Sequence, residues 1–399
     1  MAFAFRCQPL KGLYMLGSIL VLLFIRLPVW TILGLVPSWR PLPTWSLGRS
    51  LIVQAFQAYV GILFNTAIDA PARPRENAPD AVKSGLVWID PTPDLIVGEV
   101  RDFANANRVQ AEKVPGYWHG SRASDGTAGQ RASPGEKVVY HFHGGAFIMG
   151  SASPSDPGSK TCFTGFMEHF PNNPRVFGLE YRLTRGHPLG RANPFPSALI
   201  DAIAGYRYLV QDVGFEPQNI LLSGDSAGGN LAFVLAYYLA TYQLPNLPNA
   251  GGLLLLSPTV DWANTHTGAR SSMVRHSRTD YVGPIFDSGY TKDTLVGDLP
   301  AETASSVWIS PASLKTKVST GMFSQIPRTC IVVGGEEMTL DPVVTLRDRL
   351  QADMGKEAVT YIEAVDCTHD FLTMGWHEPE RTNVLREVAV WVDRLWKSV

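Results

Sequence analysis

The chain lacks an excess of either charge. Its 399 residues carry 34 Lys and Arg against 36 Asp and Glu, which gives a formal net charge of −2. Nucleic-acid-binding domains carry a clustered basic excess, so we expect no nucleic acid partner. No repeat or long low-complexity tract occurs either. The length therefore predicts one large domain with insertions or two modest domains.

Cysteine is scarce, and its spacing excludes two classes of site. No two cysteines form a CxxC pair, so neither a structural zinc site nor a disulfide framework is expected. The four are Cys7, Cys162, Cys330 and Cys367. We expect no metal and no cofactor. The chain also has no Asn-x-Ser/Thr acceptor for N-glycosylation, which argues against a glycosylated lumenal domain.

Two long apolar runs occupy the N-terminus. Gly12–Ile25 carries no charge, and after an interruption at Arg26 the apolar sequence continues to Trp39. A membrane-spanning helix needs about 20 apolar residues, so we expect this run to be a single-pass signal anchor. A monotopic interfacial hairpin is the alternative. A second run, 51–68, contains two glutamines and is more typical of an interfacial or substrate-access helix.

Six apolar runs alternate with helical patterns along the rest of the chain. Several are continuously apolar, as central parallel strands covered on both faces are. Alternation of strands and helices over this length predicts an α/β fold with a doubly wound, mostly parallel sheet. The expected strands are 138–145, 175–183, 219–226, 252–258, 329–336 and 358–365; the expected helices are 197–213, 231–242, 342–354 and 382–396.

These patterns divide the chain into three parts. Residues 1–70 are expected to form the membrane anchor and the interfacial or cap helices. Residues 71–95 are rich in Pro and charge and are expected to be a linker. Residues 96–399 are expected to form the main α/β domain, in which the irregular stretch 262–325 is expected to be a helical cap or an insertion.

The strongest local motif is Gly224-x-Ser226-x-Gly228. It lies between an apolar strand and a helical pattern, which is the context of a nucleophile elbow. The flanking glycines remove Cβ atoms that would clash with the strand and the helix. The turn would project the serine hydroxyl, with the N–H of Ala227 and the helix N-terminus facing any negative charge that forms. The alternative is a glycine-rich turn that binds phosphate or only packs.

A second glycine-rich loop follows an earlier strand, in the sequence VYHFHGGAFIMG. If Ser226 attacks an acyl carbonyl, the oxyanion needs preorganised donors. The backbone N–H groups of Gly144, Gly145 and Ala146 are expected to supply them. His143 would orient this loop by hydrogen bonding rather than transfer a proton.

Together the motifs HGG-A-F, GDSAGGNLA, EYRL followed by HP and NPFPSALID, and SPTVDW resemble the hormone-sensitive-lipase-like branch of the α/β hydrolases. The resemblance covers roughly residues 95–395. It implies Ser226 as nucleophile, with the 143–146 loop and Ala227 as oxyanion hole. It also implies a carboxylesterase, lipase or deacetylase. Membrane-anchored members, the arylacetamide and fungal steryl deacetylases, carry a similar apolar N-terminus, so an endoplasmic reticulum location is expected.

The chain departs from the family pattern in two places. Ala146 stands where the family has a third glycine, so the N–H donor is kept but a methyl group is added beside it. The usual APEHP is replaced by TRGHP at 184–188, and LGRAN is inserted before PFPSAL. Because this loop supports the active site in the family, its local geometry is in question.

The base is expected to be His369, which follows the last apolar strand, where the histidine of this fold belongs. Two acids remain open. Aligned without gaps from the strand ending at Gly335, Glu337 takes the family's acid position and Asp341 takes the second Asp that starts a helix. Asp341-Pro also reads as an ordinary helix start. We therefore favour Glu337 and keep Asp341 as the alternative.

These residues predict a serine carboxylesterase or deacetylase acting through a Ser-His-acid triad. The expected substrate is a short-chain acyl ester of a lipophilic alcohol, such as a sterol, a terpenoid or another secondary metabolite. An acyltransferase with the same acyl-enzyme is one alternative. A non-catalytic ligand receptor on the same fold is another. The oligomeric state is not predicted.

Overall fold

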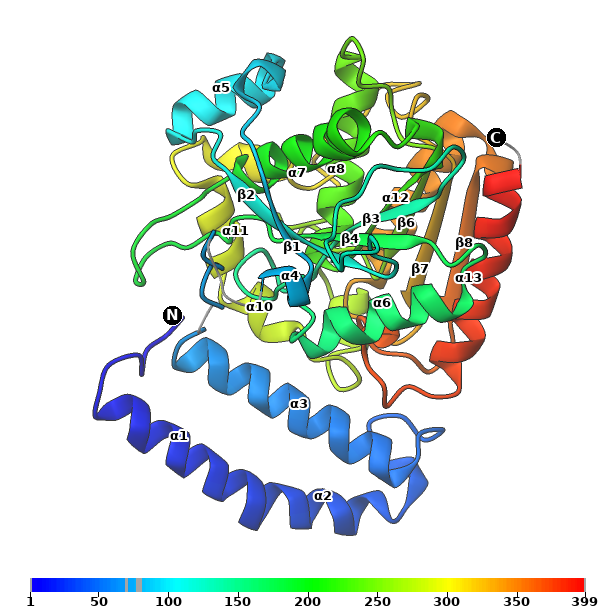
Figure 1. Ribbon diagram of the computed structural model, residues 1–399. Helices are drawn as coiled ribbons and strands as arrows, with labels where there is room; N and C mark the ends of the chain where they lie inside the picture. The colour runs from blue at the N-terminus through cyan, green and yellow to red at the C-terminus, as the bar shows by residue number, and fades with distance from the viewer. Residues whose placement is uncertain (1, 69–70, 77–80, 398–399) are drawn as a thin grey trace.

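The computed structural model describes residues 2–68, 71–76 and 81–397 (Figure 1). Its centre is an eight-stranded sheet in the order β1-β2-β4-β3-β5-β6-β7-β8, in which the six strands from β3 to β8 run parallel. This confirms the predicted fold class. The strands are β1 Leu86–Ile89, β2 Val114–His119, β3 Val138–Phe142, β4 Arg175–Leu179, β5 Ile220–Asp225, β6 Gly252–Leu256, β7 Thr329–Gly334 and β8 Val359–Ala364.

The first two strands correct the expected linker. β1 lies inside the segment 71–95 and pairs antiparallel with β2, with Leu86 opposite Tyr117. The prediction of a linker was therefore wrong for residues 86–89. β2 was not predicted because its sequence, VPGYWH, places a proline and a glycine in the strand. Gly116 is needed there, since a Cβ would come 2.3 Å from the ring of Phe177 on β4.

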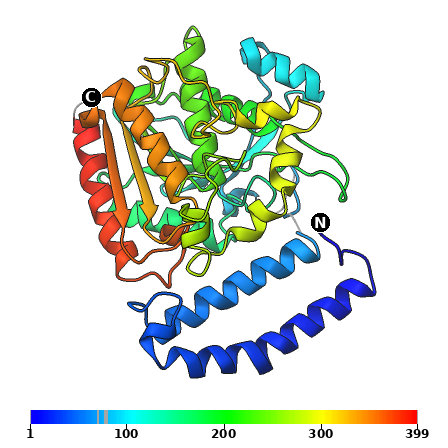
Figure 2. The ribbon, with the colours of Figure 1, turned by 180° about the vertical axis from the view of Figure 1, so that it is seen from behind.

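Helices cover both faces of the sheet (Figures 1 and 2). α6 and α13 pack on one face, with an apolar cluster beneath them that includes Phe163, Phe166 and Val388. α7, α8 and α12 pack on the other face over the larger cluster. Their bounds are α6 Pro157–His169, α7 Ser197–Arg207, α8 Ala227–Tyr242, α12 Leu340–Met354 and α13 Glu380–Lys397, with α5 Gly98–Asn107 at the periphery.

The stretch 262–325 contains three short helices, α9 Ser272–Arg275, α10 Gly283–Asp287 and α11 Tyr290–Val296. α3, Leu47–Asn65, packs against α10. Phe56 of α3 meets the ring of Tyr281 edge-on at 4.6 Å, and Gln57 donates to the carbonyl oxygen of Asp280 at 3.0 Å. The N-terminal helix α3 therefore packs together with the segment 262–325, which is called the cap below.

α3 is also tied to the sheet and its helices at its N-terminal end. Arg49 forms a two-point ion pair with Glu380 at the start of α13, at 2.9 and 2.7 Å. Trp45, just before the helix, donates from its indole to the carbonyl oxygen of Asp366 at 2.7 Å. α3 is thus joined both to the cap and to the loop that follows β8.

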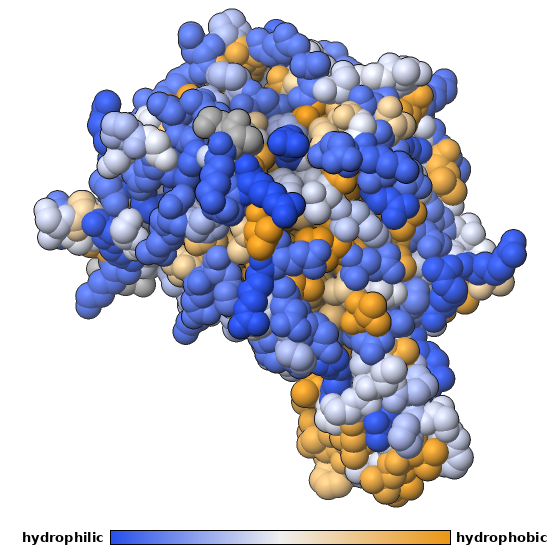
Figure 3. Space-filling view, turned by 90° about the vertical axis from the view of Figure 1, so that its right-hand side faces the viewer, coloured by the Kyte–Doolittle hydropathy of each residue, from blue (hydrophilic) through white to orange (hydrophobic). Residues whose placement is uncertain are grey.

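The first helix has a different character. α1 Leu10–Val21, a π-helical turn Leu22–Arg26 and α2 Leu27–Gly34 form one continuous helix that lies outside α3 (Figure 1). Its mean hydropathy over 18 residues is 2.1, and none of that window is buried. By length and composition, this helix and α3 could both cross a membrane. Figure 3 shows apolar surface on this N-terminal extension.

Candidate active site

Ser226 lies in the sharp turn between β5 and α8, with φ of 51° and ψ of −115°. A non-glycine residue adopts this conformation only where its surroundings impose it. The glycines make the turn possible. A Cβ on Gly224 would lie 2.2 Å from the carbonyl oxygen of Gly228, and one on Gly228 would lie 1.9 Å from that of Phe142. The expected nucleophile elbow is therefore formed.

The structure brings three of the predicted residues into one hydrogen-bonded series. The hydroxyl of Ser226 lies 2.8 Å from His369 Nε2. His369 Nδ1 lies 3.0 Å from Glu337 Oε2. Ser226 comes from the β5–α8 turn, Glu337 from the loop after β7 and His369 from the loop after β8. All three are buried. In this order the imidazole can take the hydroxyl proton, and the carboxylate orients the imidazole and stabilises the imidazolium.

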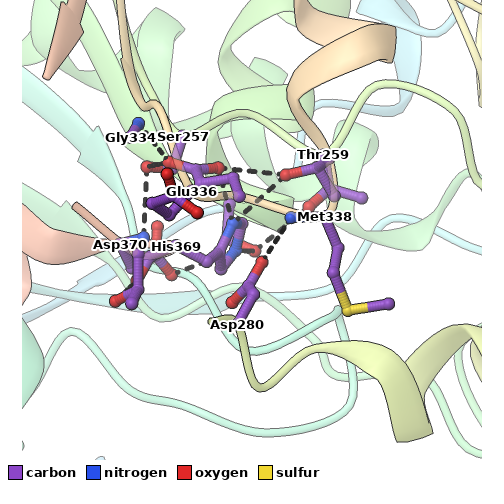
Figure 4. A network of polar contacts seen from close by, with 12 residues as sticks. Ser257, Thr259, Asp280, Gly334, Glu336, Met338, His369 and Asp370 are labelled. Atoms are coloured by element: carbon purple, nitrogen blue, oxygen red, sulfur yellow. Dashed lines mark hydrogen bonds and ion pairs between the residues drawn. The ribbon is translucent and has the colours of Figure 1, made fainter. Parts of the chain in front are cut away.

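Glu337 is held by donors on both carboxylate oxygens. Oε1 accepts from Ser257 Oγ at 2.5 Å and from the Gly334 N–H at 2.6 Å. Oε2 accepts from Thr339 Oγ1 at 3.0 Å, in addition to His369. Figure 4 shows part of this network, with Ser257 and Gly334 beside His369. These bonds orient the carboxylate toward the imidazole.

The alternative acid is not brought to the histidine. Asp341 lies in the first turn of α12, where its carboxylate accepts from the Ser272 N–H at 2.8 Å and meets Arg275 at 3.2 Å. It therefore attaches the cap helix α9 to α12. Asp341 stands four positions after Glu337, within the first turn of α12, and among the described residues no hydrogen bond or ion pair joins its carboxylate to His369.

Other carboxylates surround His369 as well. Burial lowers the pKa of His369, but Asp370 and Glu337 act in the opposite direction and raise that pKa from 6.5 to about 10. Asp280, in the cap, is buried, and burial raises its pKa to about 6. Its neighbour Tyr281 donates its hydroxyl to the His369 carbonyl oxygen at 2.9 Å. The cap thus contacts the histidine loop directly.

The expected oxyanion donors are only partly available. The Gly144 N–H already donates to Asp225 Oδ2 at 3.0 Å. The expectation that Gly144 supplies a free donor was therefore wrong. Within the described residues, the N–H groups of Gly145 and Ala146 form no hydrogen bond. The N–H of Ala227 lies in the first turn of α8, where a helix leaves its N–H groups without an intrahelical partner.

The backbone of the glycine-rich loop is strained at three consecutive residues. Gly145, Ala146 and Phe147 all have positive φ, of 107°, 55° and 60°. Only glycine adopts such angles freely, and an alanine there costs about 1 kcal/mol. A Cβ on Gly145 would lie 2.3 Å from the Met149 carbonyl oxygen. The loop therefore presents consecutive N–H groups in a conformation that an extended strand would not give.

The two histidines of the VYHFHGG stretch have separate structural partners. His141 Nε2 lies 3.0 Å from Asp225 Oδ1, and its Nδ1 lies 3.1 Å from Ser223 Oγ. His143 donates from Nδ1 to the Gly144 carbonyl oxygen at 2.7 Å and stacks on Tyr181 at 4.3 Å. Burial lowers the pKa of His143 to about 4, so it is neutral. Among the described residues, neither ring is hydrogen-bonded to Ser226.

Several site residues were not found from the sequence. Asp225 joins the glycine-rich loop to the nucleophile turn through Gly144, and its place beside Ser226 in GDSAG was the available signal. Ser257 and Thr339 hold the acid, and Thr259 Oγ1 lies 3.2 Å from Ser226 Oγ. In the part of the chain that the structure describes, no group of three His, Cys, Asp or Glu side chains is arranged to hold a metal ion.

The chain is similar to known proteins both in sequence and in fold. The profile of a family described as the alpha/beta hydrolase fold matches residues 139–373. The chain is 30% identical to esterase LipU of Mycobacterium tuberculosis over 259 residues, which is 64% of this chain and 77% of that esterase.

Solved structures show the same likeness. A hormone-sensitive lipase from a metagenome library is 26% identical, with a TM-score of 0.53 over 70% of this chain and 82% of that one. The carboxyl esterase 2 of the fungus Tuber melanosporum shares the fold, with a TM-score of 0.59 and 17% identity over 86% and 98% of the two chains. The resemblance to the hormone-sensitive-lipase-like branch is thereby confirmed.

Proposed function

The chain belongs to the α/β hydrolase family, as a serine hydrolase of ester bonds, and we propose that its substrate is a short-chain acyl ester of a lipophilic alcohol. The observation that carries the assignment as an ester hydrolase is the series Glu337–His369–Ser226, joined at 3.0 and 2.8 Å. No step needs a cofactor, because nucleophile, base and acid are all side chains of the chain itself.

In the first half-reaction Ser226 attacks the ester carbonyl while His369 Nε2 takes its proton. The carbonyl oxygen becomes an oxyanion, and the N–H groups of Gly145, Ala146 and Ala227 face it. Removing one such donor typically costs about 2.7–4 kcal/mol of barrier. Glu337 stabilises the imidazolium through Nδ1, and His369 then gives the proton to the leaving alcohol.

In the second half-reaction water attacks the acyl-enzyme, with His369 again as base. The acid is released and Ser226 regains its proton. An alcohol in place of water would give acyl transfer through the same intermediate, which is the second candidate. Hydrolysis is favoured by the esterase and lipase relatives. The intact series of serine, histidine and acid favours an enzyme over a ligand receptor.

The acyl group is proposed to be short because of Ala146. Its side chain is 2% exposed, and it directly precedes Phe147, which is also buried. The methyl group occupies space beside the oxyanion donors that a glycine would leave open. We therefore expect acetate to be preferred over longer acyl groups, which makes deacetylation the proposed activity.

The lipophilic alcohol is proposed from the position of α3. Its Phe56 contacts Tyr281, which in turn donates to the His369 carbonyl oxygen. The exposed apolar helix Leu10–Gly34 lies on the outer side of α3. A substrate dissolved in a membrane, such as a sterol or terpenoid acetate, would thus reach α3 and the cap before it reaches Ser226. We propose a single-pass signal anchor in the endoplasmic reticulum for this first helix.

An acyl-chain series tests the proposal. The full chain is purified in detergent and assayed on p-nitrophenyl acetate, butyrate and octanoate, with Ser226→Ala as the blank. We expect acetate to be cleaved fastest, and Ala146→Gly to raise the butyrate-to-acetate ratio of kcat/KM. Equal rates on all three esters in the wild type would refute the short-acyl preference. Absence of hydrolysis above the blank would refute the esterase.

The anchor is tested separately. After expression of the full chain in eukaryotic cells, we expect it to stay in the membrane pellet on alkaline carbonate extraction, in the fraction of the endoplasmic reticulum. Release into the supernatant would contradict a membrane-spanning segment and leave the interfacial arrangement.

A further inference from the structure

Asp370 lies directly after His369 and faces it from the side opposite to Glu337. Its Oδ2 is 3.5 Å from His369 Nε2, the atom that also bonds Ser226. Its Oδ1 is buried and has no hydrogen-bond partner among the described residues. A buried carboxylate oxygen without a donor is costly, and the ion pair that Oδ2 forms with a protonated His369 offsets part of that cost for the carboxylate as a whole.

The backbone holds Asp370 in this place. Its φ of 54° lies in the left-handed region, which Asp tolerates better than most residues. Its N–H donates to Ser257 Oγ at 3.1 Å, and the same hydroxyl donates to Glu337 Oε1. Ser257 therefore ties the positions of the two acids together. The Glu337 carboxylate meets the Nδ1 edge of the imidazole, and the Asp370 carboxylate meets the Nε2 edge.

The groups that face this pair are mostly acidic. Asp225 comes from the end of β5, Asp280 and the Tyr281 hydroxyl from the cap, and Glu337 from the loop after β7. Burial raises the pKa of Asp370 well above its usual value, and His369 lowers it. Of the groups that raise the pKa of His369, Asp370 contributes most. The attraction between the two residues therefore favours the protonated imidazole.

We propose that Asp370 is a positioning residue that binds the Nε2 edge of protonated His369 in competition with Ser226, and so sets the pH above which the enzyme turns over. This inference rests on the proposed function. In the resting enzyme, Nε2 of His369 carries a proton that is directed at Asp370. It cannot then accept the Ser226 proton, so turnover needs the neutral imidazole.

During the reaction the same contact is favourable. When Nε2 has taken the Ser226 proton, the N–H bond can point to Asp370 or to the leaving oxygen, and the carboxylate stabilises the imidazolium until the alcohol takes the proton. The proton stays on Nε2 in between, so Asp370 gains and loses none. The enzyme should accordingly work best at alkaline pH.

The test compares Asp370→Asn with a matched control. Asn removes the charge, keeps the shape and tolerates the left-handed conformation. Asp366→Asn is the control, because Asp366 lies in the same loop with φ of 62°, and among the described residues no hydrogen bond or ion pair joins its carboxyl to His369. The pH profile of kcat/KM is recorded on an alkyl acetate by acid release, with Ser226→Ala as the blank.

An opposite charge at this range typically shifts a pKa by about 1 to 3 units. We therefore expect the acidic limb of the Asp370→Asn profile to move to lower pH by at least about 1 unit, and that of Asp366→Asn to stay in place. Asp370→Gly, which accommodates the left-handed backbone freely, is the second variant if the first does not fold, and the same shift is expected. An unmoved limb overturns the inference, as does loss of activity at every pH in a folded variant.

A second readout separates this inference from the proposed function. The imidazole of His369 is titrated by NMR without substrate in wild type and Asp370→Asn. We expect its midpoint to fall in the variant. If the midpoint falls but no ester is cleaved, the pairing stands and the esterase fails. If esters are cleaved and the midpoint is unchanged, the esterase stands and the role of Asp370 fails.

Discussion

Replacing Glu337 by Gln should remove most of the activity with little change in shape. Oε1 accepts from Ser257 and from the Gly334 N–H, and a backbone N–H can only donate. The amide oxygen must therefore take the Oε1 position. The amide NH₂ then faces His369 Nδ1, which has to become an acceptor. That moves the imidazole proton to Nε2, and a protonated Nε2 can no longer take the proton of Ser226.

The magnitude follows from this wrong tautomer. The corresponding acid-to-amide change in a Ser-His-Asp protease costs about 10⁴ in kcat, which is about 5.4 kcal/mol of barrier at about 1.36 kcal/mol per factor of ten. We expect a loss of this order in Glu337→Gln. Asp341→Asn is the matched control and should keep activity within about threefold, because Asp341 holds α9 to α12 and does not reach the histidine.

The assay is kcat on p-nitrophenyl acetate for both variants, with thermal unfolding and circular dichroism to show that each is folded. A kcat of Glu337→Gln within tenfold of wild type would refute Glu337 as the acid. That assignment is also refuted if Asp341→Asn is the variant that loses activity, because the register that separates the two acids would then be wrong.

Two further predictions concern packing. Gly228→Ala should prevent folding of the elbow, since its Cβ would lie 1.9 Å from the Phe142 carbonyl oxygen, whereas Gly375→Ala, with no atom within 4 Å, should be tolerated; soluble yield and melting temperature report this, and a folded, active Gly228→Ala would contradict it. A thiol reagent should modify only the exposed Cys7 in the native chain and all four cysteines after denaturation; rapid native modification of more than one thiol would contradict the burial of Cys162, Cys330 and Cys367.

The parallel part of the sheet was predictable because its strands are continuously apolar and separated by helices. The strands β1 and β2 were not, because β1 lies in a polar, proline-rich stretch and Gly116 is explained only by its contact with Phe177 on another strand. A single sequence shows the periodicity of a strand, but it does not show the side chain on the neighbouring strand that requires a glycine at this position.

The candidate site shows the same limit. The elbow has a fixed local sequence, so Ser226 could be identified from its neighbours. Glu337 could be chosen over Asp341 by counting residues from the end of a strand. Gly144 was assigned a free N–H because its partner, Asp225, lies 81 positions away. The role of Asp370 depends on distances across three loops, which no spacing in the sequence encodes.

The central claim is that Ser226 is the nucleophile of an ester hydrolase. The most direct measurement is the turnover of p-nitrophenyl acetate by purified Ser226→Ala beside wild type, with melting temperatures for both. We predict that wild type turns over the ester, and that the variant keeps its fold and loses hydrolysis to the level of the buffer blank. Retained turnover by the folded variant would contradict the claim.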